Sequence, residues 1–110
     1  MKKTLFFSIA ASMLISAPIF AQSNQAAATL ANQSGCLVCH KVNEKLVGPG
    51  FQDVAEKYKG QASAVDMLAQ KIKKGGAGSW GRIPMPPHPQ LSDESANILA
   101  AWVLKGAPPQ

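Results

Sequence analysis

The stretch Gly35-Cys36-Leu37-Val38-Cys39-His40 decides how this chain is organised. Two residues separate its cysteines, and a histidine directly follows the second cysteine. This spacing is the attachment signature of c-type haem, in which each thiol adds to one vinyl group of the porphyrin. The histidine is then held beneath the iron, where a neutral ring nitrogen can bind it. The motif predicts one haem c bound covalently through Cys36 and Cys39, with His40 as an iron ligand.

Three other kinds of site use similar residues. A thioredoxin-like redox pair requires a strand–helix unit around the cysteines, and the sequence indicates none. A structural zinc site requires four ligands, whereas the chain offers only Cys36, Cys39, His40 and the distant His88. A disulfide across two residues is usually strained and leaves His40 without a role. The motif by itself leaves these alternatives open.

The N-terminus has the order of a secretory signal peptide. Two lysines are followed by an apolar run, Thr4–Phe20, and Ala21 supplies a small residue at the cut. An uncut membrane anchor is the alternative, although the run is just shorter than the ~20 residues of a spanning helix. We therefore expect residues 1–21 to be a signal peptide and residues 22–110 to form one small domain in the periplasm.

Composition narrows the classes of function. The chain has 110 residues, with 11 Lys plus Arg against 6 Asp plus Glu, which gives a net charge of +5. A single small domain of this size is only marginally stable on its own core, so a large apolar cofactor would help helices to pack. The sequence has no basic run interleaved with aromatic residues, and nucleic acid is therefore a poor partner.

Hydrophobic spacing predicts helices and no strands. We expect an all-α fold of about four helices wrapped round the haem. Ser63 and Asp66 resemble a capping box, and Ser92 is a good N-cap. The tail from Ala107 onward is expected to fray. The predicted helices are 24–34, 51–59, 63–74 and the segment from Ser92 up to Gly106. Their expected inner faces are Ala27, Leu30 and Ala31 in the first, Phe51, Val54, Ala55 and Tyr58 in the second, Val65, Leu68 and Ile72 in the third, and Ile98, Leu99, Trp102 and Val103 in the last.

A long Gly- and Pro-rich loop, Gly75 to Leu91, carries the candidate for the second axial ligand. Met85 lies within Ile83-Pro84-Met85-Pro86-Pro87, where prolines fix φ and remove competing amide donors. A soft thioether suits Fe(II) and raises the reduction potential. We predict Met85 as the ligand opposite His40. His88 is the rival ligand, and an open sixth position is the third option.

With these motifs in hand, the sequence resembles the short bacterial class I cytochromes c, the small periplasmic monohaem carriers of respiratory chains. The resemblance covers nearly the whole chain after the signal peptide. It runs through Gly35–His40, Val47-Gly48-Pro49-Gly50, Leu68-Ala69-Gln70-Lys71-Ile72-Lys73, Trp80-Gly81-Arg82-Ile83-Pro84-Met85-Pro86-Pro87 and Ala101-Trp102-Val103.

The resemblance implies roles for further residues. The carbonyl of Pro49 accepts a hydrogen bond from the second ring nitrogen of His40 and orients it. Trp80 donates its indole N–H to a haem propionate near Lys71, although simple core packing is the alternative for this tryptophan. Trp102 packs the last helix against the first.

One position departs from the family pattern. Family members often have an asparagine after Met-Pro-Pro, and this chain has His88 there. The histidine either replaces the hydrogen bond near the sulfur, titrates near neutral pH, or faces water.

The resemblance implies a non-enzymatic one-electron carrier, because an iron with both axial positions filled has no site for substrate. Its expected partners are redox proteins: a bc1-type complex as donor, and a nitrite reductase, a peroxidase or a terminal oxidase as acceptor. Docking would use an apolar patch formed by Leu37, Val38 and the Ile83–Pro87 edge, within a rim of lysines, and the carrier would be a monomer. The alternatives are an electron-entry subunit of a larger enzyme and a haem-based sensor with an open sixth site.

Overall fold

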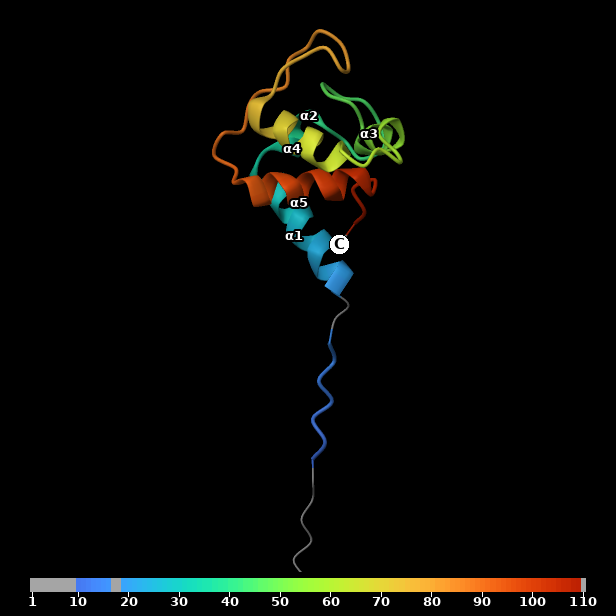
Figure 1. The fold of residues 1–110 in the computed structure, drawn as a ribbon. Helices are drawn as coiled ribbons and strands as arrows, with labels where there is room; N and C mark the ends of the chain where they lie inside the picture. The colour runs from blue at the N-terminus through green and yellow to red at the C-terminus, as the bar shows by residue number, and fades with distance from the viewer. Residues whose placement is uncertain (1–9, 17–18, 110) are drawn as a thin grey trace, which may run out of the picture.

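Five helices make up the regular structure in a computed structural model of the chain, which describes residues 10–16 and 19–109 (Figure 1). Those residues contain no strand, only an isolated antiparallel bridge between Gly76 and Met85. The all-α prediction is therefore confirmed. The helices are α1 (Ile19–Gln33), α2 (Cys36–Cys39), α3 (Phe51–Lys57), α4 (Ala64–Lys74) and α5 (Asp93–Leu104).

The predicted signal peptide, residues 1–21, lies partly outside the described residues, and its cleavage stays a prediction. In the described part of the chain, no helix is both long enough and apolar enough to cross a membrane.

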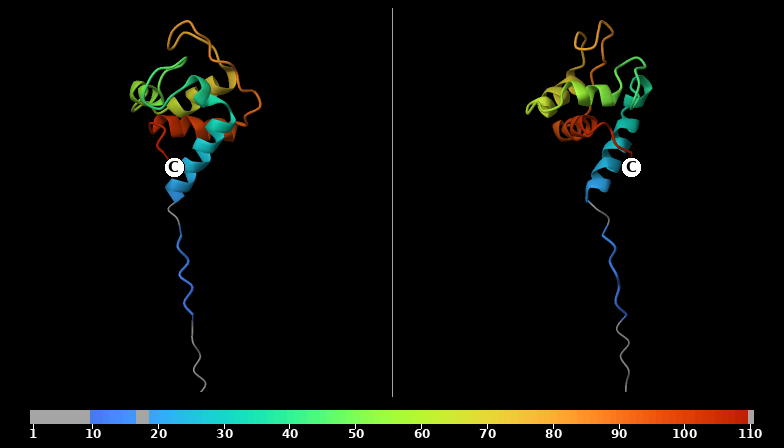
Figure 2. Two further views of the ribbon diagram at one scale, coloured as in Figure 1. Left: turned by 180° about the vertical axis from the view of Figure 1, so that it is seen from behind. Right: turned by 90° about the vertical axis from the view of Figure 1, so that its right-hand side faces the viewer.

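Helix α5 is the centre of the fold, because α1, α3 and α4 all pack against it (Figures 1 and 2). Ala27 and Ala31 of α1 belong to one buried cluster with Leu99 and Trp102 of α5. The predicted inner face of the first helix is thus confirmed. The small alanine side chains let the two helices approach closely, which leaves room for the larger leucine and tryptophan.

A second cluster of alanines joins α4 to α5. Ala69 of α4 is 3% exposed, and Ala96 and Ala100 of α5 are fully buried. Val65, Leu68 and Ile72 pack against this cluster from α4, as their helical spacing predicted. Helix α4 is thereby held along α5, with its C-terminal end at the start of the long loop.

The two predicted N-caps have different outcomes. The Ser92 hydroxyl accepts a hydrogen bond from the Ser95 amide at 3.0 Å, which confirms the cap of α5. The capping box at Ser63 is wrong, because its side chain makes no capping hydrogen bond. Ser63 has φ −88° and ψ 2° rather than the extended conformation that directs a capping side chain back to the first turn.

The end of the chain also differs from expectation. The tail does not fray at Ala107, which is 2% exposed and donates its amide to the Trp102 carbonyl at 3.0 Å. Trp102 Nε1 donates to the Pro108 carbonyl at 3.1 Å, because a buried indole N–H requires an acceptor. Ile98, predicted to be buried, is 40% exposed, since α1 and α4 cover the neighbouring positions of α5 instead.

The α4–α5 contact predicts that Ala96 tolerates no larger side chain. Ala96→Leu is expected to lower the free energy of unfolding by about 1–3 kcal/mol, because the site has no space for added methylenes. Urea unfolding of the holoprotein measures this change. Asn97→Leu, at the adjacent exposed position, is the control and should stay within about 0.5 kcal/mol of the parent protein. Equal stability of the two variants would contradict tight packing here.

An exposed ion pair at the same end of the fold predicts a pH dependence. Lys73 of α4 pairs with Asp93 of α5, and this contact lowers the pKa of the Asp93 carboxyl below its ordinary value. A lowered pKa in the folded state stabilises the fold above the unfolded pKa, and that contribution is lost as pH falls through the folded value.

We therefore expect Asp93→Asn to be slightly less stable than the parent at neutral pH, with the difference vanishing in acid. Urea unfolding at both pH values measures it, with Glu94→Gln as the control in the same helical turn. A difference that persists in acid would assign the effect to something other than this pair.

Candidate haem site

A cavity of about 330 Å³ opens between the loop that follows α2 and the loop that follows α4. These two loops stand side by side above α4 and α5 (Figures 1 and 2). Side chains of α3, α4 and α5 line the inner wall with largely apolar groups, among them Phe51, Val54 and Leu99. All of the predicted site residues line this one cavity: Cys36, Cys39, His40, Pro49, Lys71, Trp80 and Met85.

The single turn of α2 presents both thiols to the cavity. Gly35 precedes it with φ 76°, a left-handed conformation that ends α1 and starts the new turn. Cys36 and Cys39 are half-buried free thiols, so no disulfide joins them. Burial raises the pKa of the Cys36 thiol. The sequence did not predict this turn as a helix, because four residues are too few for a hydrophobic period.

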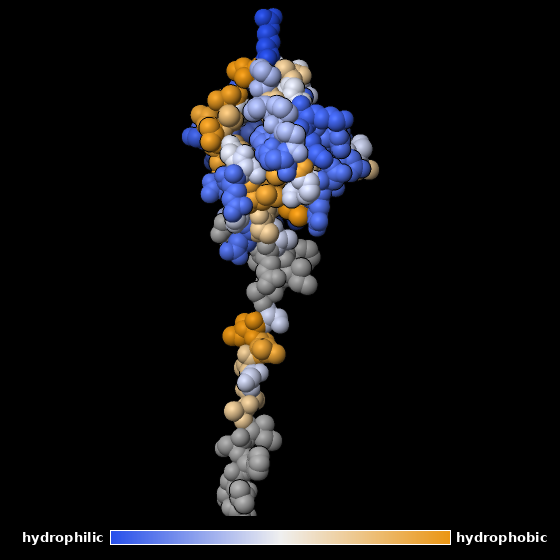
Figure 3. Space-filling view, turned by 90° about the vertical axis from the view of Figure 1, so that its left-hand side faces the viewer, coloured by the Kyte–Doolittle hydropathy of each residue, from blue (hydrophilic) through white to orange (hydrophobic). Residues whose placement is uncertain are grey.

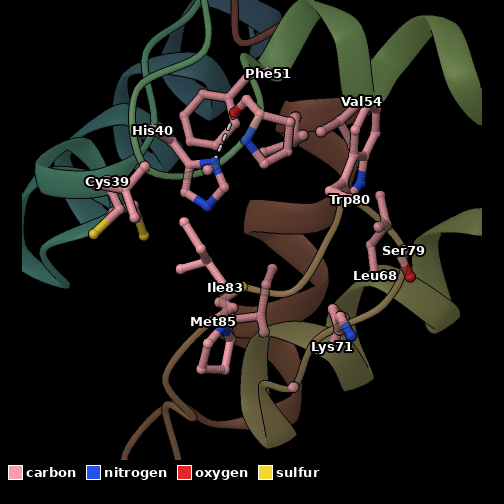
Figure 4. A pocket seen from close by; sticks show the side chains of 18 of the residues that line it. Cys39, His40, Phe51, Val54, Leu68, Lys71, Ser79, Trp80, Ile83 and Met85 are labelled. Carbon is pink, nitrogen blue, oxygen red and sulfur yellow. Dashed lines mark hydrogen bonds between the residues drawn. The ribbon is translucent and has the colours of Figure 1, made fainter.

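His40 is held in one orientation by contacts on several sides. Its Nδ1 lies 2.7 Å from the Pro49 carbonyl oxygen. Because a carbonyl only accepts, Nδ1 donates a proton in this contact, and in the neutral imidazole Nε2 is then the nitrogen with the lone pair. Figure 4 shows this hydrogen bond and the ring aimed into the pocket. The Phe51 ring stacks on the imidazole, with centroids 5.0 Å apart and planes 20° apart.

Gly48 is a site residue that the sequence reasoning missed. A Cβ at this position would lie 2.5 to 3.0 Å from three atoms of the His40 ring, closer than real Cβ atoms approach. The backbone of Gly48 therefore fills the space beside the imidazole. The sequence could have indicated this role, because Gly48 directly precedes Pro49, whose carbonyl was predicted to accept a hydrogen bond from His40.

Met85 reaches the cavity from the opposite loop. Figure 4 places Met85 and Ile83 across the pocket from His40. The Met85 amide donates to the Gly76 carbonyl at 2.9 Å, and the Gly76 amide donates to the Met85 carbonyl at 2.9 Å. This pair of hydrogen bonds fixes the Met85 backbone to the residue just beyond α4, and the prolines on either side restrict it further.

His88, the rival ligand, does not line the cavity. Its amide donates to the carbonyls of Ile72 and Lys73, both at 3.1 Å, and its Nδ1 lies 3.2 Å from the Ile72 carbonyl oxygen. The residue is half-buried and caps the C-terminus of α4, rather than simply facing water. Sequence reasoning missed this role because the carbonyls it satisfies belong to a distant helix.

The two tryptophans occupy different environments. Trp80 lines the cavity and is 40% exposed, and its hydrogen bond to a haem propionate stays a prediction. It lies on the opposite side of the pocket from Cys39, near Ser79 (Figure 4). Trp102 is 5% exposed and meets Phe51 edge-on, with centroids 5.6 Å apart. It therefore belongs to the core behind the ring of Phe51.

The donor set fits haem c. The two thiols and the imidazole come from one helical turn and the residue that follows it, and the largely apolar wall suits a flat porphyrin. The described residues hold no group of three or more His, Cys, Asp or Glu side chains that could bind a metal ion without a porphyrin. The zinc alternative therefore finds no support, and the described residues contain no strand–helix unit for a thioredoxin-like pair.

An all-α fold that encloses such a pocket defines a small class I cytochrome c. The sequence profile of the Cytochrome c family matches residues 25–107, and the chain belongs to that family. As a member, it is a small electron carrier with covalently bound haem c.

Curated relatives and solved structures agree with this assignment. Cytochrome c-551 of Azotobacter vinelandii is 59% identical over 70 residues, which cover 64% of this chain and 84% of that protein. The crystal structure of wild-type Nitrosomonas europaea cytochrome c552 superposes with a TM-score of 0.69 at 47% identity, covering 72% of this chain and 98% of the other. The class 1 cytochrome MtoD of Sideroxydans lithotrophicus ES-1 gives 0.66 at 30% identity, covering 76% and 96%.

The contact between Gly48 and His40 predicts the effect of one methyl group. Gly48→Ala should displace the imidazole and weaken its hydrogen bond to Pro49, and destabilise the fold by about 1–3 kcal/mol. The His40 Nδ1–H resonance in NMR spectra of the reduced holoprotein reports the hydrogen bond, and urea unfolding reports the stability.

Gly60→Ala is the matched control for this variant. Gly60 has φ 76° with open space around it, so the added methyl strains only the backbone, by about 1–2 kcal/mol. The control should lose stability while leaving the His40 resonance in place. An unshifted His40 resonance in Gly48→Ala would show that the glycine does not position the ring.

Proposed function

We propose that this chain carries single electrons in the periplasm, with its haem iron bound axially by His40 and Met85. Membership of the cytochrome c family establishes the small haem electron carrier, and the proposal adds the ligands and the compartment. The observation that carries it is that Cys36, Cys39, His40 and Met85 line one cavity, with the two axial candidates on opposite sides.

The residues of α2 and the loop after it tether and orient the cofactor in this proposal. Cys36 and Cys39 form the two thioethers, which fix the ring beside His40. The hydrogen bond from Nδ1 to Pro49 keeps Nε2 unprotonated and makes the imidazole a better donor. When bound, the haem supplies the Fe(III)/Fe(II) couple.

Met85 and the apolar wall set the direction in which the reduction potential moves. A thioether stabilises Fe(II) relative to Fe(III), and low dielectric disfavours the additional charge of the ferric state. Both effects raise the potential. The position of His88 on the carbonyls at the end of α4 supports Met85 as the sixth ligand.

Exposed apolar residues near the cavity support docking of partner proteins. Leu37 is 42% exposed and Val38 is 73% exposed, and neither lines the cavity. The space-filling view shows apolar residues gathered along one side of the folded body, with hydrophilic residues over much of the remainder (Figure 3). Such a patch suits brief contacts that exchange an electron, while exposed lysines attract acidic partners.

We infer the electron donor and the electron acceptor from the family resemblance. A bc1-type complex would reduce the carrier, and a nitrite reductase, a peroxidase or a terminal oxidase would oxidise it. Residues 1–21, as a cleaved signal peptide, would place a monomeric carrier of residues 22–110 among these partners.

The axial ligands are tested by the near-infrared spectrum of the oxidised holoprotein. A sulfur-to-iron(III) charge-transfer band is expected in the parent protein and should vanish in Met85→Ala. Met67→Ala is the matched control, because Met67 is 40% exposed on α4 and does not line the cavity. This variant should keep the band.

Absence of the band from the parent protein would overturn His/Met ligation. His88→Asn then separates the remaining options, because it changes the visible spectrum if His88 binds the iron and leaves it unchanged if the sixth position is open. The open position would favour the sensor over the carrier.

A further inference from the structure

Lys57, the last residue of α3, connects that helix to the loop that carries Met85. Its ammonium donates to the Ser79 carbonyl at 2.8 Å, across 22 positions of the sequence. The same nitrogen lies 4.3 Å from the centroid of the Trp80 ring, well within cation–π range, and 5.5 Å from that of Tyr58. One side chain therefore holds both the backbone and the aromatic ring of the loop.

Few hydrogen bonds within the protein fix the tip of this loop. Gly76 and Met85 pair at its base, and the Gly78 amide donates to the Gly81 carbonyl at 2.9 Å within the tip. Residues 76–84 all line the cavity. Among residues 10–16 and 19–109, the hydrogen bond from Lys57 is the one that joins the tip, residues 77–83, to another part of the chain.

Lys57 is held in place because it belongs to helix α3, whose other end packs in the core. Its first residue, Phe51, is buried and stacks on the His40 ring. Its last residue is Lys57, about 9 Å further along the helix axis. The helix therefore contacts the predicted iron ligand at one end and the loop that closes the pocket at the other.

The charge on Lys57 acts on the pocket through Trp80. The lysine does not line the cavity, whereas Trp80 does, at the side opposite Cys39 (Figure 4). A cation behind the indole polarises it and makes its N–H a stronger donor toward an acidic group in the pocket. A positive charge near the site also favours the reduced state of the iron, which carries one positive charge fewer.

We propose that Lys57 is a positioning residue of the haem site, which fastens the loop tip to α3 and holds Trp80 against the pocket. It thereby raises the reduction potential. This inference depends on the proposed function at one point, because it takes Trp80 to face the haem. It assigns Lys57 a role separate from the lysines that form the general basic surface.

The test compares Lys57→Met with Lys59→Met in the holoprotein. Lys57→Met removes the charge and the hydrogen bond while keeping an apolar side chain, and Lys59 is an exposed lysine two positions further on. We expect exchange of the Gly78 amide, which donates to the Gly81 carbonyl, to accelerate about tenfold in Lys57→Met, because the hydrogen bond from a charged donor that fixes the tip is lost. The reduction potential should fall in the same variant.

Lys59→Met should leave both measurements unchanged, and Lys57→Arg should restore both, since arginine keeps the charge and the stacking. The proposal is overturned if either amide exchange or the potential in Lys57→Met equals that of Lys59→Met, or if Lys57→Arg restores neither. The near-infrared band should persist in all three variants. Its loss in Met85→Ala tests the axial ligands independently, so failure of one proposal is distinguishable from failure of the other.

Discussion

The hydrogen bond from His40 Nδ1 to the Pro49 carbonyl, 2.7 Å long, is the constraint on which the site depends. It determines which ring nitrogen is protonated and aims the other into the cavity. This hydrogen bond requires the chain after α2 to fold back so that Pro49 lies beside His40. Two hydrogen bonds to the Cys39 carbonyl hold the folded-back segment, one from the Val47 amide at 3.2 Å and one from the Gly48 amide at 2.8 Å. The glycine, the proline and the stacked Phe51 then leave the imidazole one orientation.

The opposite side of the cavity is held by contacts of a different kind. The loop after α4 has no regular structure, so it is held by paired amides at its base, by His88 on the last carbonyls of α4, and by Lys57 at its tip. A site whose two halves are fixed by separate contacts can keep His40 rigid while tolerating sequence change in the loop.

The sequence predicted what depends on local pattern. The haem motif, the loop methionine and the faces of α1, α3 and α4 follow from spacing, and all the expected site residues line one cavity. The failures arise from tertiary contacts. Ile98 is exposed because neighbouring helices determine which face of α5 is covered, and the chain end is ordered because Trp102 binds Pro108. Gly48 and His88 acquire their roles from groups that spacing alone cannot place beside them.

The order of α1 and α5 along the chain has a consequence for biosynthesis. Its residues complete the core with Ala27 and Ala31 of α1, so the two ends of the domain must meet before that core exists. Such distant contacts slow folding and leave it incomplete until α5 has been synthesised. Leu99, Ala100 and Trp102 of α5 also form part of the cavity wall. A chain in which α5 has not yet been synthesised therefore has neither a closed core nor a finished pocket.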